Sequence, residues 1–312
     1  MNVHHPLFDL YVVVDWSASS TPKRGADSIW THVTERSQGH PVAVQEPVNH
    51  PTRADAREYL VQLLTVRPHQ RILVGFDMPY GYPSGFAEAA GLPGSPAWAA
   101  AWQHLVVQID DAPDNANNRF RVASDLNAAI SDGPGPFWGT TSESHVTPTL
   151  ARTKAPGFPH EHLAEHRLAE HRLAEQALRS AGLRPASVWQ LAGAGSVGSQ
   201  TLMGVPVVHA LRHHPSLKQR SAIWPFETGL APDPTHGKLN AIVHAEIWPS
   251  WLGRPDATRH AVNDAAQVSA LSEHLAALDD RGELSPLFAP ALDDDTAKVV
   301  VEEEGWIVGA VV

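Results

Sequence analysis

Three short, largely apolar runs that each end in an acidic residue constrain the fold of this chain more than any other feature. They lead into Asp15, Asp77 and Glu246. An apolar run bounded by turn-forming residues is typical of a strand buried on both faces. A carboxylate at the end of such a strand is costly to desolvate without a partner, and a cation is the commonest remedy. The pattern therefore predicts a sheet that brings several acids together.

The first part of the chain predicts the order strand, strand, strand, helix, strand. Short links favour an antiparallel meander for the first three strands. Thr52 is placed to cap a helix that runs to about Val66. The predicted strands cover residues 9–18, 27–35, 41–48 and 71–77.

The remainder of the chain predicts a large insertion, from about 85 to 220, between two core strands. No break in charge or composition marks it as a separate domain, so we expect a single domain over residues 1–312. The expected helices lie at 96–110, 115–131, 160–181, 207–212 and 259–277, and the expected strands at 187–191, 223–226, 240–249, 299–301 and 306–308, with loops between 132 and 158.

Four acids form the candidate catalytic and metal-binding set: Asp15, Asp77, Glu246 and Asp264. Two divalent cations about 4 Å apart can activate a water and stabilise a leaving oxygen in phosphoryl transfer. Mg²⁺ or Mn²⁺ would need hard oxygen ligands from several strands. In this hypothesis Asp15 bridges both metals, Asp77 and Asp264 each hold one, and Glu246 completes the ligand set or orients the water. The alternative is that Asp15 and Asp77 cap turns by accepting backbone N–H bonds.

The motifs around these acids resemble the ribonuclease H-like fold, and more narrowly a family of uncharacterised bacterial proteins described as predicted nucleases. The family pattern joins Asp-x-Ser, Asp-x-Pro-x-Gly, Glu-x-x-Pro and a late helical Asp. Here these fall on Asp15 and Ser17, on Asp77, Pro79 and Gly81, on Glu246 and Pro249, and on Asp264. The resemblance implies an α/β protein with a mixed sheet, three antiparallel strands followed by parallel ones, and helices on both faces. It also implies metal-dependent phosphodiester hydrolysis. Related chains have also been described as cofactor-biosynthesis proteins, but no residue of this chain supports that description.

Glu227 is an alternative to Glu246, because it also follows an apolar segment, at 223–226. The Glu-x-x-Pro match favours Glu246. If Glu227 lay near Asp15 instead, this assignment would be wrong.

The stretch Gly193–Gly198 matches the dinucleotide-binding pattern G-x-G-x-x-G. That pattern requires a preceding strand, an uninterrupted helix and an acid about 20 residues further on. We expect Gly204-Val205-Pro206 to interrupt the helix, and no acid lies between 213 and 220. The sequence thus favours a glycine-rich turn near the acids, lending N–H groups to an anion, over the site of a dinucleotide-dependent oxidoreductase.

A second motif, His162-x-x-Glu165-His166, fits an inverted zinc-protease pattern. It lies inside a repeat of Leu-Ala-Glu-His-Arg that extends to Glu175. Glu and Arg at such spacings favour a solvated helix with paired side chains. We therefore read the repeat as a surface helix.

Candidate substrate-binding residues follow the acidic motifs: Ser17, Lys23, Arg24 and Tyr80. Lys23 and Arg24 come soon after the first acid and can meet phosphates, although solvated loop charges would look the same. Other basic residues considered for phosphate contact are Arg119, Arg121, Arg152 and Lys154.

Composition limits the partners. The net charge of −11 disfavours broad binding to nucleic acid, which rests on phosphate neutralisation by Lys and Arg. We expect nucleic acid or a small phosphorylated ligand as partner, and the rival hypothesis is a non-catalytic protein that binds a small anion in the same cleft.

Cys is absent, which excludes thiolate chemistry. No apolar run approaches the roughly 20 residues that span a bilayer, and the first ten residues lack the features of a secretion signal, so we expect a cytoplasmic protein.

Overall fold

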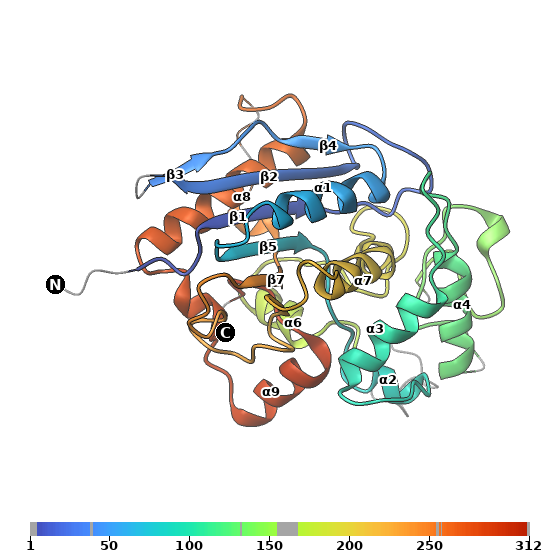
Figure 1. The fold of residues 1–312 in the computed structure, drawn as a ribbon. Coiled ribbons are helices and arrows are strands. Elements are labelled where there is room, and N and C mark those ends of the chain that lie inside the picture. Colours follow the sequence, from blue (N-terminus) through green and yellow to red (C-terminus); the bar gives the residue numbers. More distant parts are fainter. Residues whose placement is uncertain are drawn as a thin grey trace.

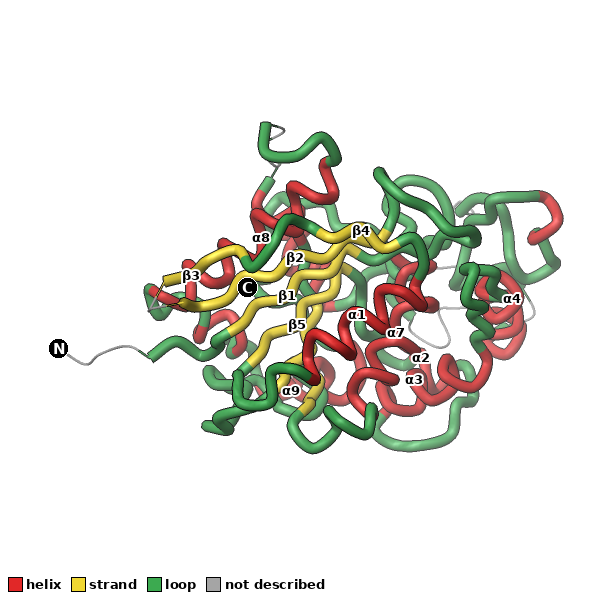
Figure 2. Tube along the Cα trace, turned by 45° about the horizontal axis from the view of Figure 1, so that its top comes forward, coloured by secondary structure: helices red, strands yellow, loops and turns green. Residues whose placement is uncertain are grey.

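A mixed β-sheet runs through the protein, with helices on both faces (Figures 1 and 2). The computed structural model describes residues 5–37, 40–131, 133–154, 168–253, 256 and 258–310. The strands are β1 (Leu10–Asp15), β2 (Ile29–Ser37), β3 (His40–Ala43), β4 (Val48–His50), β5 (Ile72–Asp77), β6 (Ser221–Ile223) and β7 (Ile242–Glu246).

The strand order is β3-β2-β1-β5-β7-β6, and β4 also pairs with β2. The pairs of β2 with β1, β3 and β4 are antiparallel, whereas β1–β5, β5–β7 and β7–β6 are parallel. This confirms the predicted α/β class and the change from antiparallel to parallel strands that a ribonuclease H-like fold requires. The single strand predicted at 41–48 is two short strands, both paired to β2.

The helices surround this sheet. They are α1 (Arg53–Thr65), α2 (Phe86–Ala89), α3 (Ala97–Gln108), α4 (Arg119–Ile130), α6 (Leu173–Ser180), α7 (Val197–His213), α8 (Asn263–Asp280) and α9 (Asp294–Val299), with 3₁₀ turns at Glu143–His145, Pro249–Leu252 and Ser285–Phe288 and a π turn at Val300–Glu304.

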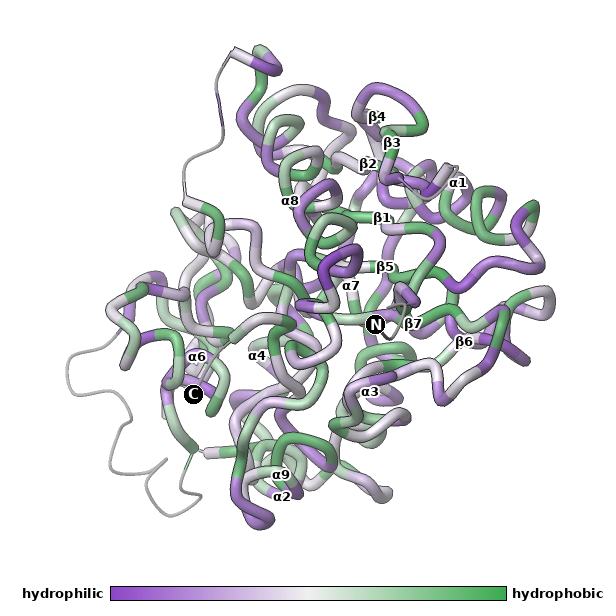
Figure 3. The backbone as a smooth tube through the Cα atoms, turned by 90° about the vertical axis from the view of Figure 1, so that its left-hand side faces the viewer, coloured by the Kyte–Doolittle hydropathy of each residue, from purple (hydrophilic) through white to green (hydrophobic). Residues whose placement is uncertain are grey.

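Alternate residues of the central strands enter two different cores. On β1, Val12 and Val14 pack in the core shared with α1 and α7, while Tyr11 and Val13 pack in the core shared with α8. Figure 3 shows α8 and α1 on opposite sides of β1 and β5. Burial on both faces explains the continuous apolar runs, since each buried valine contributes roughly 1.5–3 kcal/mol of transfer free energy.

The helix after β4 follows its local sequence closely. Thr52 caps α1, and its hydroxyl accepts a hydrogen bond from the Asp55 N–H at 3.1 Å. The cap satisfies one of the free N–H groups of the first turn. The predicted start at Thr52 and end at Val66 are confirmed.

Several predictions for the insertion and the C-terminal region are wrong. Residues 187–191 form no strand, only a bridge between Trp138 and Gln190. Helix α7 is far longer than predicted and continues through Pro206. Residues 299–301 belong to α9 and the π turn, and of residues 306–308 only Ile307 forms a β-bridge, to Glu246.

Packing explains why α7 tolerates its proline. Pro206 has no N–H to donate within the helix. Leu202, Val205 and Val208 are nevertheless fully buried in the core next to the sheet. Tertiary contacts therefore outweigh the lost hydrogen bond. Of the helix predicted at 160–181, residues 168–181 are described: 168–172 form no helix, and α6 covers only Leu173–Ser180.

Candidate functional site

Asp15 and Asp77 end the two neighbouring parallel strands β1 and β5 and are Cα partners in register. Parallel strands present their carboxyl ends at one edge of the sheet. The two side chains retain partial solvent exposure although other protein atoms surround them closely. The fold therefore brings together the first two acids of the sequence prediction.

Neither carboxylate has a hydrogen-bond donor or an ion-pair partner among the described residues. Burial, followed by the charges of Asp77, Asp264 and Asp27, raises the pKa of Asp15 well above its usual range. The pKa of Asp77 is raised to about 7, first by burial and then by the negative charges of Glu246 and Asp264. Two such groups side by side need a shared proton or a bound cation.

Asp264 lies in the first turn of α8, as predicted, and that helix packs on β1 and β2. Its carboxylate accepts a hydrogen bond from the Asp27 N–H at 2.7 Å. Burial raises the pKa of Asp264, while this N–H opposes the shift. Three acids from β1, β5 and α8 thus influence one another electrostatically.

Glu246 ends β7 but is already paired. Arg172 holds both of its oxygens, with Nη2 to Oε1 at 2.5 Å and Nη1 to Oε2 at 2.8 Å. The Tyr80 N–H donates to Oε2 at 2.9 Å. Burial raises the pKa of Glu246 and the Arg172 guanidinium opposes that shift. Glu175 also pairs with Arg172.

Glu227 lies elsewhere. It accepts from Arg212 Nε at 2.7 Å and from the Ile223 N–H at 2.8 Å. Glu246, and not Glu227, is among the acids whose charge raises the pKa of Asp77. Between the two rivals, the structure places Glu246 beside the acidic pair.

A cavity of about 420 Å³ opens beside the acids. Its walls come from the end of β1 and the following loop, the start of α8, and the insertion. The lining residues are Asp15, Trp16, Ser17, Ala18, Ser19, Lys23, Asp27, Ser28, Arg119, Thr141, Leu191, Ala192, Gly193, Ala194, Gly195, Ser196, Ser199, Gln200 and Asp264.

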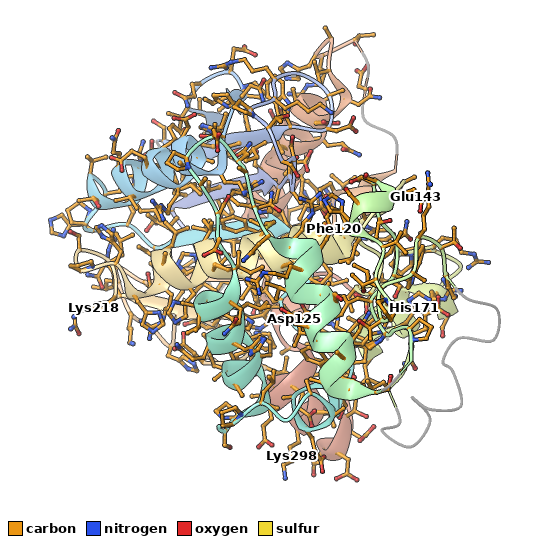
Figure 4. The ribbon with its side chains drawn as sticks, turned by 90° about the vertical axis from the view of Figure 1, so that its right-hand side faces the viewer. Phe120, Asp125, Glu143, His171, Lys218 and Lys298 are labelled. Atoms are coloured by element: carbon orange, nitrogen blue, oxygen red, sulfur yellow. The ribbon has the colours of Figure 1, made fainter. Side chains whose placement is uncertain are left out.

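Arg119, at the start of α4, supplies a buried positive charge to this cavity. It is 6% exposed. Its Nε donates to Ser199 Oγ at 2.9 Å, and its Nη1 donates to Ser20 Oγ at 2.7 Å and Asn117 Oδ1 at 2.8 Å. Figure 4 shows this end of α4 at the neighbouring Phe120, beside the turn that carries Glu143.

The charge of Arg119 has no carboxylate partner among the described residues. Burial, with Arg53 nearby, lowers its pKa to about 10, so the guanidinium remains protonated at neutral pH. The nearby Arg53 differs, because it forms an ion pair with Asp111 at 2.6 Å. A buried cation without an acid partner can bind an anion where a cavity reaches it, and Arg119 lines the cavity.

The turn at 193–196 forms another part of the wall. Gly193 and Gly195 have positive φ angles of 90° and 77°, which glycine adopts without strain. No acceptor within the described residues takes the N–H groups of Ala194, Gly195 and Ser196. The three residues that carry these donors line the cavity in front of α7.

The same turn does not complete a dinucleotide-binding fingerprint. A helix follows it, contrary to the expected interruption, but no strand precedes it and no acid follows at the required distance. A Cβ at Gly198 would lie 2.2 Å from the Val188 carbonyl oxygen. Gly198 therefore permits close packing of α7 on the preceding segment.

The predicted substrate-binding residues separate into two groups. Ser17 and Lys23 line the cavity; the Ser17 hydroxyl donates to the Asp27 carbonyl at 3.0 Å, and Lys23 pairs with the Asp27 carboxylate at 3.1 Å. Arg24 is exposed, donates to the Asn49 carbonyl and does not line the cavity. Tyr80 is buried outside it, and its hydroxyl has no hydrogen-bond partner within the described chain.

The donor chemistry of the site fits a divalent cation only in part. Asp15 and Asp77 offer unpaired carboxylate oxygens close to Asp264, the ligand type that Mg²⁺ and Mn²⁺ favour. Glu246 is not available as a metal ligand while Arg172 holds both of its oxygens. Across the residues described, no group of three or more His, Cys, Asp or Glu side chains is arranged to hold a metal. Water or substrate oxygens would have to complete a ligand set. The His162–His166 motif lies outside the described residues.

Three site residues had no clear signal in the sequence. Arg119 was one of several basic candidates, and burial alone distinguishes it. Arg121, Arg152 and Lys154 instead pair with Asp125, Glu143 and Glu170 near the surface. Arg172 belongs to the charged repeat that we read as a solvated helix, yet it is fully buried. The only signal at Asp27 was its position at the start of the strand predicted at 27–35.

Comparisons with protein-family models, with curated proteins and with solved structures found no match to this chain. Within the described residues, no helix combines the length and the apolar character needed to cross a membrane.

Proposed function

We propose that this protein hydrolyses phosphate esters with the help of Mg²⁺ or Mn²⁺ bound at Asp15 and Asp77. The observation that carries the proposal is the pairing of these carboxylates on adjacent parallel strands without a donor or cation among the described residues. A cation would remove their mutual repulsion. Membership of the predicted-nuclease family and a cytoplasmic location, which the absence of Cys favours, are part of this proposal.

Each residue of the site would have its own role in this reaction. Asp15 and Asp77 would hold the cation, with Asp264 as a further oxygen ligand. The bound metal would supply Lewis-acid stabilisation and a more acidic water. Arg172 fixes the position of the Glu246 carboxyl group, and Glu246 in turn holds the backbone after β5 through the Tyr80 N–H. Lys23, on the cavity wall, would attract the anionic substrate.

Calorimetric titration of Mn²⁺ tests the proposal directly. We expect the wild type and Asp125→Asn, an exposed control, to bind Mn²⁺, and Asp77→Asn to lose binding. Phosphomonoesters and phosphodiesters would then be assayed with Mn²⁺ and with EDTA. Equal binding by wild type and Asp77→Asn, or hydrolysis that persists in EDTA, would contradict the proposed site.

A second function is favoured by the pairing of Glu246 with Arg172, which leaves fewer acids for a metal. In that case the cavity would bind a small anionic ligand without catalysis, in a regulatory or cofactor-biosynthesis role. Ligand binding that EDTA leaves unchanged, with no turnover of any ester, would support this function over hydrolysis.

A further inference from the structure

The cavity contains, besides the acids, a group of donors that the metal chemistry does not use. Arg119 is buried and without an acid partner in the described chain, and it lines the same cavity as the turn at 193–196. The N–H groups of Ala194, Gly195 and Ser196 lack acceptors there. These donors come from α4 and from the segment before α7, far apart in sequence.

The donors differ in origin but share one requirement, which is a negatively charged acceptor. Hydrogen bonds from Arg119 to Ser199, Ser20 and Asn117 fix the guanidinium without neutralising it. None of these hydrogen bonds uses its Nη2. Successive free N–H groups in a turn that contains positive-φ glycines form a concave donor set for anions. A guanidinium beside such a turn matches the several oxygens of a phosphate group.

We propose that Arg119 and the N–H groups of residues 194–196 bind the phosphate group of a small phosphomonoester. The anion site stands on its own geometry, whereas its use by a substrate rests on the proposed function.

The size and charge of the surroundings favour a small molecule over a nucleic-acid strand. A volume of about 420 Å³ falls in the range of pockets for small ligands. The protein has a net charge of −11, and the cavity also exposes Asp15, Asp27 and Asp264. A polyanion would meet repulsion along its length, but one phosphate directed at Arg119 would not.

Binding of inorganic phosphate, measured by calorimetry in EDTA, tests the anion site. We expect Arg119→Gln to weaken binding by roughly tenfold to a hundredfold, because a charged hydrogen-bonding partner is lost. Arg121→Gln, on the exposed side of the same helix, is the matched control and should bind as wild type. Phosphate binding that is absent in the wild type, or equal in Arg119→Gln, would overturn the proposal.

A second pair of variants covers the case in which Arg119→Gln fails to fold. Ser196 has φ −75°, which proline adopts, and its side chain makes no capping bond. Ser196→Pro removes one N–H donor and should weaken phosphate binding severalfold, while Ser196→Ala keeps the N–H and should not. Equal affinity for phosphate in both variants would contradict the role of the turn.

Competition and activity separate this inference from the proposed function. A phosphomonoester such as a nucleoside monophosphate should displace phosphate, and an oligonucleotide without terminal phosphates should not. Displacement by the oligonucleotide alone would overturn the small-molecule assignment. Asp15→Asn should keep phosphate binding while losing any Mn²⁺-dependent hydrolysis. Phosphate binding without hydrolysis in the wild type would refute only the proposed function.

Discussion

Asp15 lies directly beside Asp77, its register partner across the parallel β1–β5 pair, and neither carboxylate receives a hydrogen bond from the described residues. Such a pair destabilises the folded protein when both groups are ionised. The arrangement is therefore expected to cost stability at neutral pH, as sites that bind a ligand or cation often do.

The substitution Asp77→Asn should stabilise the protein above neutral pH. The pKa of Asp77 is raised from 3.8 to about 7, so the folded state binds more protons than the unfolded state between these values. The contribution of Asp77 to the free energy of unfolding of the wild type is therefore greatest below about pH 4, and it is lost as the pH rises to 7. Asn cannot ionise and avoids the loss, which gives a gain of about 1–4 kcal/mol at pH 8. Urea unfolding in EDTA at pH 4 and pH 8 measures it. A gain of equal size at both pH values would contradict the explanation.

Mn²⁺ affinity should rise with pH across the range around 7. A cation competes with the protons that Asp15 and Asp77 retain because of burial and mutual repulsion. Affinity should increase by up to about tenfold per pH unit while one of the two carboxyl groups is protonated, and level off once both have lost their protons. Titrations at pH 6, 7 and 8 check this dependence. A flat profile would show that the metal, if bound, uses other groups.

Loss of Arg172 should destabilise the fold strongly. Its guanidinium compensates Glu246 and Glu175, and all three side chains are buried. Arg172→Gln would leave buried carboxylates without a cation and should cost about 3–5 kcal/mol. Chemical denaturation provides the value. The control is Arg179→Gln, at an exposed position of α6, which should change stability by less than about 0.5 kcal/mol. Similar effects of the two substitutions would contradict the assigned role.

A methyl group at Gly198 should disturb the start of α7. The added Cβ would lie 2.2 Å from the Val188 carbonyl oxygen, a backbone atom that has little freedom to move. We expect Gly198→Ala to cost about 1–3 kcal/mol by overpacking. Thermal unfolding compared with Ser196→Ala, which adds no atoms next to this contact, tests the expectation. Unchanged stability would mean that the preceding segment can shift.

Local sequence was sufficient for the core of the fold. The strands that end at Asp15, Asp77 and Glu246 were predictable because residues buried on both faces of a sheet must be apolar almost without interruption. The cap at Thr52 was predictable because its hydroxyl acts on an N–H only three residues away.

The insertion was less predictable, because its structure depends on distant contacts. Pro206 would end an isolated helix, and only burial against the core keeps α7 continuous. Residues 187–191 have strand-like composition but find no neighbouring strand among those described. Local sequence preference therefore decides neither whether α7 continues through Pro206 nor whether residues 187–191 form a strand.

The sequence by itself determined that acids end the central strands and that a glycine-rich turn precedes a helical segment. Only the tertiary structure decided that Asp15 and Asp77 stay unpaired among the described residues, while Arg172 takes Glu246. It also brought Arg119 to the cavity beside the turn. The physical reason is that charge compensation depends on distances of a few ångströms between side chains, and chain folding sets these distances between residues remote in sequence.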